Sequence, residues 1–199
     1  ENAIWSKQSY YTGTLRVDLP EDAAAQAKNP ERRFAGAKYI LIEEVGRGAM
    51  GIVWKAWQTD LRRYVAIKLL AGAGWTDQDL RRFHREAQMA ASLSHSNIAS
   101  IFEVGADAGR HFIAMEFVDG DPLSALVTPP TSGSRQGTQR RPVGLRRAVE
   151  IVRDAAIAVD YAHSKGIIHR DIKPSNVMVA RQGGRTYVMD FGLARPVRD

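Results

Sequence analysis

The stretch His169-Arg170-Asp171-Ile172-Lys173-Pro174-Ser175-Asn176, followed further along the chain by Asp190-Phe191-Gly192, decides the expected fold and chemistry. Each polar residue in these two segments could by itself belong to a turn. The whole set in this order is not explained by chance. It combines the residue types that phosphoryl transfer needs, namely a carboxylate for the attacking hydroxyl and oxygen ligands for Mg²⁺ on the phosphates. The sequence therefore predicts a phosphoryl-transfer site.

Four residues of these segments suit specific roles. Asp171 could receive the proton of the attacking hydroxyl or orient that hydroxyl. Asn176 and Asp190 carry the oxygen atoms that Mg²⁺ prefers. Lys173 adds positive charge near the transferring group. These assignments make the segment a candidate catalytic loop.

A glycine-rich segment, Gly46-Arg47-Gly48-Ala49-Met50-Gly51-Ile52-Val53, lies upstream. Glycine lets a tight strand–loop–strand bring backbone N–H groups close to phosphates, where side chains would collide. Taken alone, the segment could equally be a plain turn. A strand follows it instead of a helix, which argues against a dinucleotide-binding Rossmann unit. The segment also lacks the Gly-Lys-Ser/Thr ending of a Walker-type loop.

Lys68 is predicted to face inward from a strand. Strand alternation places Lys68 and Ala66 on one face and Val65 and Ile67 on the other. Because burial of an unpaired ammonium is costly, Lys68 needs a carboxylate partner. Glu86 lies on or beside the apolar stripe of the next helix, so we expect it to pair with Lys68. The alternatives are a lysine that reaches solvent from an edge strand and a glutamate at the rim of its helix.

The apolar patterns predict a strand-rich first part and a helical second part. The expected strands are Tyr39–Val45, Ile52–Trp57, Tyr64–Leu70, Ile98–Val104 and His111–Val118, with shorter pieces at Val177–Ala180 and Thr186–Met189. Residues 1–38 are expected to form an N-terminal extension, in which Glu21–Asn29 is either linker or a short docked helix. The Pro-, Ser- and Arg-rich residues Thr128–Gly144 are typical of a flexible connection.

Two long helices are expected. The first begins at Thr76 or Asp77, and its apolar stripe is predicted to comprise Leu80, Phe83, Ala87, Ala90 and Leu93. The second spans Leu145–Lys165, with Gly166 as its stop signal. Its inward face is predicted to comprise Leu145, Ala148, Val149, Val152, Ala156 and Val159.

Composition excludes several other classes of protein. The 199 residues include no cysteine, which excludes a disulfide scaffold, a thiolate metal site and a cysteine nucleophile. The apolar runs are too short for a membrane span, and no charged-then-apolar leader opens the chain. The net charge is +6, but the basic residues are dispersed and no aromatic residues interleave with them, so no nucleic-acid partner is expected.

The motifs, taken together, resemble those of a eukaryotic-type protein kinase. The glycine loop, strand lysine, helix glutamate, catalytic loop and Asp-Phe-Gly follow one another in the order of that family. Lys173 with Pro174 resembles the Ser/Thr branch, and the wording of Ile172–Asn176 is similar to bacterial members. The resemblance covers residues 39–199 and stops shortly after Gly192. We therefore expect a fragment of a longer kinase, without the activation segment and the later helices.

The resemblance implies an α+β, bilobal protein-kinase-like fold. The N-lobe and hinge would occupy residues 39–118, as an antiparallel five-stranded sheet with one main helix. Residues 119–199 would form the incomplete start of a helical C-lobe. His169 would then be structural, stacked with Phe191, Ala90 and Ile101.

The resemblance also assigns roles residue by residue. The implied catalytic residues are Asp171, Lys173, Lys68 and Glu86, and the implied metal ligands are Asn176 and Asp190. The implied ATP-binding residues are Val45, Gly46, Gly48, Gly51, Val53, Ala66, Lys68, Met115, Glu116, Val118 and Met178. In this set Met178 is the floor of the adenine pocket, Met115 is the gatekeeper, and Glu116 and Val118 offer hinge backbone groups. The implied cofactors are ATP and Mg²⁺, with Mn²⁺ as a substitute.

The leading hypothesis is a cytoplasmic, ATP-dependent protein serine/threonine kinase whose partner is a protein with a Ser or Thr acceptor. A nucleotide-binding regulatory or scaffold module without phosphotransfer is the alternative. A small-molecule kinase of the same fold is a third hypothesis, although such kinases usually lack this glycine loop and the Lys173-Pro174 form of the catalytic loop.

Overall fold

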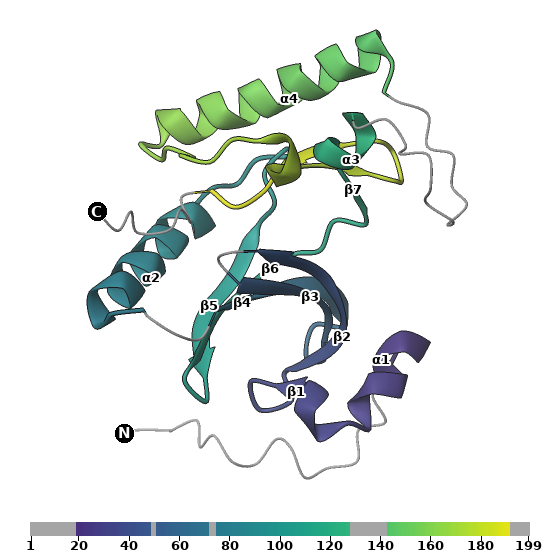
Figure 1. Cartoon of the computed structure of the whole chain (residues 1–199), viewed down its shortest axis with the longest axis vertical. Helices are drawn as coiled ribbons and strands as arrows, with labels where there is room; N and C mark the ends of the chain where they lie inside the picture. Colours follow the sequence, from purple (N-terminus) through teal and green to yellow (C-terminus); the bar gives the residue numbers. More distant parts are fainter. Residues whose placement is uncertain (1–18, 49–50, 72–74, 128–142, 192–199) are drawn as a thin grey trace, which may run out of the picture.

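The computed structural model describes residues 19–48, 51–71, 75–127 and 143–191. Figure 1 shows a large curved sheet at one end of the molecule and the long helix α4 (Leu145–Ser164) at the other. A small second sheet lies next to α4, and helix α2 (Asp77–Ala91) runs alongside the large sheet. The expected two-part arrangement, strand-rich and then helical, is confirmed.

The large sheet is antiparallel and has six strands in the order β1-β2-β3-β4-β6-β5. Its strands are β1 Arg33–Phe34, β2 Tyr39–Gly48, β3 Gly51–Gln58, β4 Arg63–Leu70, β5 Ile101–Asp107 and β6 Arg110–Glu116. The five expected strands are present, and β1 is an additional edge strand of two residues. β5 begins at Ile101 instead of Ile98, because Ile98 forms a bridge to Val188 outside this sheet.

Strand β4 separates two apolar clusters, as its alternation predicted. Val65 and Ile67 belong to one cluster, together with Tyr39 and Phe112. Ala66 faces the other cluster, which contains Phe83 and Ala87 of α2. Lys68 shares the α2 side with Ala66 and is 7% exposed. The buried ammonium group of Lys68 therefore lies on the side of the sheet that faces α2.

Helix α2 begins where the sequence predicted. Thr76 is its N-cap, and Thr76 and Asp79 form a reciprocal capping box that satisfies backbone N–H groups of the first turn. Phe83, Ala87 and Ala90 are buried on its apolar stripe. The stripe packs α2 against the sheet and fixes the side from which Glu86 leaves the helix.

The inward face predicted for α4 is wrong at four of its six residues, whereas Val159 packs against the buried cluster beside the helix. Leu145, Val149 and Val152 are 82%, 60% and 63% exposed, Ala156 is exposed, and Ala148 and Val159 are half-buried. The buried residues of α4 are Ile151, Ala158 and Ala162. Apolar residues occur on several faces of α4, so the periodicity of the sequence alone did not identify which face is buried. The two alanines are small and let α4 pack closely against Val188 and Phe191.

The segment 19–38 is docked on the large sheet. Of the two interpretations of Glu21–Asn29, the short helix is confirmed as α1 (Glu21–Ala27), followed by the 3-10 turn η1 (Pro30–Arg32). Ala23 is completely buried in a cluster with Ile40, Ile42 and Trp57. The predicted flexible connection at 128–144 lies almost wholly outside the described residues.

The second sheet has the strand order β7-β8-β9, with β7 at Gly120–Pro122, β8 at Val177–Ala180 and β9 at Thr186–Val188. Short helix α3 (Leu123–Val127) follows β7, and the 3-10 turn η2 (Pro174–Asn176) precedes β8. The two strands β8 and β9 were predicted, whereas β7 was not. Within the described ranges, no helix has the length and apolarity required to cross a membrane.

Gly51 provides a test of the turn between β2 and β3. Its φ is +148°, and a Cβ atom there would lie 1.9 Å from the Leu69 carbonyl oxygen. Gly51→Ala should therefore reduce the free energy of unfolding by roughly 1–3 kcal/mol, the cost of forcing a residue into such a conformation.

Thermal unfolding without nucleotide would measure this change. Gly48→Ala is the matched control, because a Cβ atom at Gly48 meets nothing within 4 Å. Equal unfolding midpoints for the two variants would contradict the prediction.

Candidate active site

A cavity of about 990 Å³ lies where the large sheet, the segment after β6 and the second sheet meet. Ten residues predicted to bind nucleotide or metal line it: Val45, Gly46, Val53, Ala66, Met115, Glu116, Val118, Asn176, Met178 and Asp190. They come from sequence positions far apart and converge on one space. Gly48, Gly51, Lys68, Glu86, Asp171 and Lys173 are not among its lining residues. The binding and catalytic roles of both sets of residues stay predictions.

Sequence reasoning missed several lining residues, including Lys55, Tyr64 and Phe117. A signal for Lys55 was present in the sequence, because it lies two residues from Val53 on β3 and so shares its face. Tyr64 and Phe117 carried no comparable signal. Their place depends on how β4 and the segment after β6 approach one another.

Lys68 is paired with Asp190 and not with Glu86. The Lys68 Nζ atom donates to the Asp190 carboxylate at 2.7 Å, and the Lys68 side chain is 9% exposed. Asp190 lies two residues after the end of β9, so this ion pair links β4 to the segment that leaves the second sheet. The expected inward lysine with a carboxylate partner is confirmed, but the predicted partner is wrong.

Glu86 bonds instead to the Arg170 guanidinium, with 2.9 Å between Oε1 and Nη1. Two carboxylates, Asp190 and Glu86, are available to the cations Lys68 and Arg170. The physical reason for this different pairing is that Asp190 neutralises Lys68, which leaves Glu86 without the lysine. The long Arg170 side chain reaches Glu86 and pairs with it instead. The pairing satisfies both carboxylates near the cavity.

Two residues of these ion pairs, Arg170 and Asp190, have unusual backbone conformations. Arg170 has φ +64° and Asp190 has φ +61°. Non-glycine residues seldom adopt positive φ, and such strain collects at functional sites where the surroundings impose it. The positive φ values turn these two side chains out of the direction that an extended backbone would give them.

The carboxylate of Asp171 is held from two sides. Lys173 Nζ donates to its Oδ2 at 2.7 Å, and Asn176 Nδ2 donates to the same oxygen at 3.1 Å and to the Asp171 carbonyl at 2.8 Å. The hydrogen bond from Lys173 is the main reason that the pKa of Asp171 lies below its usual value, and the bond from Asn176 acts in the same direction. Asp171 is thus an oriented, ionised and accessible carboxylate.

His169 is a structural residue in this arrangement. It is 1% exposed, and its ring lies 4.6 Å from the Phe191 ring between centroids. Nδ1 accepts a hydrogen bond from the Asp171 N–H, so Nε2 donates to the Met189 carbonyl. Burial lowers the pKa of His169, which keeps the ring neutral at pH 7. Ala90 and Phe191 share one cluster with Ile101 packed against it, as the stacking prediction requires.

Asn176 and Asp190 fit a hard cation in the chemistry of their donor atoms. Asn176 turns its amide nitrogen toward Asp171, which leaves its oxygen available, and Asp190 offers a carboxylate on the same cavity. In the described ranges no group of three or more His, Cys, Asp or Glu residues gathers into a metal site. Mg²⁺ suits such a pair, because it retains water and phosphate oxygens and needs few protein ligands.

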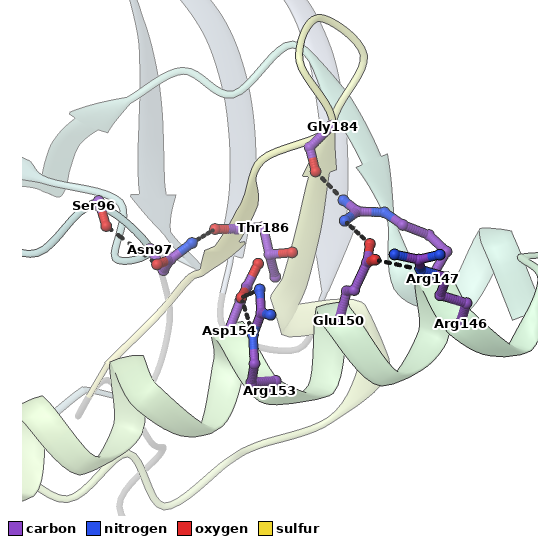
Figure 2. Close-up of polar contacts among 9 residues, drawn as sticks. All are labelled: Ser96, Asn97, Arg146, Arg147, Glu150, Arg153, Asp154, Gly184 and Thr186. Atoms are coloured by element: carbon purple, nitrogen blue, oxygen red, sulfur yellow. Dashed lines mark hydrogen bonds and ion pairs between the residues drawn. The ribbon is translucent and has the colours of Figure 1, made fainter.

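Polar contacts hold the second sheet that positions these residues, as Figure 2 shows. Arg147 of α4 donates to the Gly184 carbonyl in the β8–β9 turn and pairs with Glu150 at 3.1 Å. On the other side, Asn97 Nδ2 donates to the Thr186 carbonyl at 2.8 Å. The strands that precede Asp190 and follow Asn176 are therefore fixed from both flanks.

Comparisons with known proteins agree with this geometry. The model of the family described as protein kinase domain matches residues 39–199. The chain is 41% identical over 170 residues to serine/threonine-protein kinase PknJ of Mycobacterium tuberculosis, and the match covers 83% of this chain and 27% of PknJ. It is 39% identical over 167 residues to serine/threonine-protein kinase PknB of Mycolicibacterium smegmatis, with 81% of this chain and 25% of PknB covered.

A solved structure shows the same architecture. The Mycobacterium tuberculosis PknI kinase domain superposes with a TM-score of 0.65 at 31% identity. The match covers 82% of this chain and 63% of that domain. The chain therefore spans about a quarter of the length of the curated relatives and less than two thirds of the solved kinase domain.

The hydrogen bond from Lys173 predicts a measurable change in the titration of Asp171. Lys173→Met should raise the pKa of the Asp171 carboxyl, because the largest influence that stabilises the carboxylate is lost. Carboxyl ¹³C NMR as a function of pH would measure it. The control is Arg181→Met, since Arg181 pairs with Asp119 and Asp121 instead. An Asp171 pKa that does not move in Lys173→Met would contradict the assignment.

Proposed function

Since the chain belongs to the protein kinase domain family, we propose that the protein is an ATP-dependent serine/threonine kinase whose catalytic residues lie in this site. The observation that carries the proposal is the oriented carboxylate of Asp171, which Lys173 and Asn176 hold at 2.7 and 3.1 Å. Its side chain is 45% exposed, so a protein hydroxyl can reach it. The serine/threonine kinases among its relatives support this choice of acceptor.

In this proposal Asp171 orients a Ser or Thr hydroxyl and accepts its proton. The hydroxyl oxygen forms a bond to the γ-phosphorus of ATP, the bond from that phosphorus to the bridging oxygen breaks, and ADP leaves. Lys173 lies beside Asp171 and stabilises negative charge on the transferring group. The low pKa of Asp171 keeps the carboxylate available as a proton acceptor at neutral pH.

The cavity would receive the nucleotide. Val45, Val53 and Ala66 supply apolar wall on the side of the large sheet, and Met178 supplies it on the opposite side. Met115, Glu116 and Val118 line the connection between the two parts and would meet the adenine edge. These contacts extend the general use of ATP in this family to named residues of this chain.

Mg²⁺ would be held by Asn176 and Asp190. When bound, the ion neutralises charge on the phosphates and orients them. The Lys68 ammonium carries three N–H donors, so it can contact a phosphate while one of them still donates to Asp190 Oδ2. Mn²⁺ would substitute for Mg²⁺, because it accepts the same oxygen ligands.

A second candidate function is nucleotide binding without phosphoryl transfer. It is favoured by the pairing of Lys68 with Asp190 and of Glu86 with Arg170, because neither Lys68 nor Glu86 is in the predicted arrangement. The catalytic loop argues against this candidate, since it retains each polar residue that transfer requires.

We further propose that the protein acts in the cytoplasm, where ATP and protein substrates are available.

Asp171→Asn separates the two candidates. It should reduce phosphoryl transfer about 10²–10⁴-fold, the usual contribution of a positioned acid or base, and leave ATP binding unchanged. Transfer of labelled phosphate from ATP to a Ser/Thr protein and calorimetric ATP binding would be measured on the full-length protein.

Asp160→Asn is the matched control, because Asp160 is an exposed carboxylate on α4 away from the site. Full transfer by Asp171→Asn would overturn the catalytic role. ATP binding by the unaltered protein without any transfer would favour the second candidate.

A further inference from the structure

Helix α1 lies outside the segment that matches the kinase family, which begins at residue 39. Figure 1 shows it next to β2 of the large sheet. Ala23 is completely buried between α1 and the sheet, and Leu19 and Ala27 pack against the same cluster. The helix is therefore held on the sheet by apolar contacts as well as by the polar ones described next.

Asp22 connects α1 to two residues of the sheet. Its Oδ2 accepts a hydrogen bond from Lys55 Nζ at 2.8 Å, and its Oδ1 accepts one from the Tyr64 hydroxyl at 2.9 Å. The Lys55 side chain is 18% exposed. Its other acidic neighbour, Glu43, is 4.0 Å from Nζ and much more exposed. Asp22 is thus the principal counter-ion of a largely buried lysine.

Lys55 and Tyr64 both line the 990 Å³ cavity. The Lys55 Nζ atom lies 4.4 Å from the centre of the Tyr64 ring and 5.7 Å from that of Phe117. The two rings are 6.4 Å apart. Phe117 stands between Glu116 and Val118, the residues expected to meet adenine. A chain of direct contacts therefore runs from α1 to the adenine end of the cavity.

The charges on this connection persist at neutral pH. Burial raises the pKa of Asp22, but the hydrogen bonds from Lys55 and Tyr64 outweigh it, so the pKa of Asp22 lies below its usual value. Burial lowers the pKa of Lys55, but the bond to Asp22 prevails and raises it. Without Asp22 the ammonium would lose its close partner, and a buried unpaired cation moves toward solvent or another acid.

We propose that α1 is a positioning element of the nucleotide pocket, in which Asp22 holds Lys55 and Tyr64 against Phe117 and so preforms the adenine end. This inference rests on the proposed function, because it takes the cavity to be the ATP site. Preformed walls favour binding, since the cost of ordering them is not subtracted from the affinity for the ligand. Asp22 acts through its two partners and is given no contact with the nucleotide.

The test is a double-mutant cycle on ATP binding by the full-length protein. Asp22→Ala should raise the Kd for ATP about threefold to tenfold, in the range of couplings between residues in contact. In a Lys55→Met background the same change should have a clearly smaller effect, because the main partner is already absent. Asp22→Asn retains an acceptor oxygen for Tyr64 and should give an intermediate Kd.

Two further variants separate positioning from general destabilisation. Glu21→Ala should leave the Kd unchanged, because Glu21 is exposed and is the neighbour of Asp22 on α1. Ala23→Arg should undock the helix and raise the Kd as Asp22→Ala does, since Ala23 has no exposed surface. The Kd for adenosine should change by the same factor as that for ATP, because Lys55 lies beside the adenine end and not at the catalytic loop.

If the Kd for ATP is unchanged in both Asp22→Ala and Ala23→Arg, this inference is overturned and the proposed function is not. Equal effects of Asp22→Ala in the native and Lys55→Met backgrounds would overturn the role assigned to Lys55. A native protein that binds no ATP would instead overturn the proposed function, and this inference with it.

Discussion

The ion pair between Lys68 and Asp190 is the contact on which the arrangement of the site depends. It joins the large sheet to the segment after the small one, over a separation of 122 residues in the sequence. Lys68 is only 7% exposed, and burial of an unpaired ammonium is costly, so the close carboxylate of Asp190 stabilises it. Because Lys68 belongs to β4 and Asp190 follows the small sheet, the same pair that satisfies the charges also ties the two sheets together.

The pairing of Glu86 with Arg170 follows from this ion pair. With Lys68 neutralised by Asp190, Glu86 takes Arg170, and α2 is thereby tied to the catalytic loop. Asp171 remains outside this exchange, since Lys173 and Asn176 belong to its own loop. The site therefore combines a local unit, the catalytic loop, with a long-range network whose partners can be exchanged. In the proposed catalysis the local unit acts as it stands.

Different contacts hold the two sides of the site. On the side of the small sheet, Arg147 and Asn97 hold backbone carbonyls of the β8–β9 hairpin. On the side of the large sheet, α1 supplies a buried alanine and one carboxylate. The exposed apolar residues of α4 lie on its opposite face and contribute to neither flank.

Local patterns in the sequence determined most of the elements and the identity of the catalytic loop. The alternation of Val65 to Lys68 set the two faces of β4, and Thr76 marked the start of α2. These features depend on neighbours in the chain, so they can be read from the sequence. The resemblance of the ordered motifs to protein kinases added the fold that joins them.

Three features were decided by the tertiary structure. The partner of Lys68 depended on which carboxylate the backbone at Asp190 brings within 2.7 Å, and periodicity carries no such distance. The buried face of α4 depended on which neighbour the helix meets, because apolar residues surround much of it. The link from Asp22 to Lys55 depended on the docking of α1, since residues 33 positions apart meet only when the sheet is complete. Sequence alone determined the residue types and their order; packing decided which charges and surfaces satisfy one another.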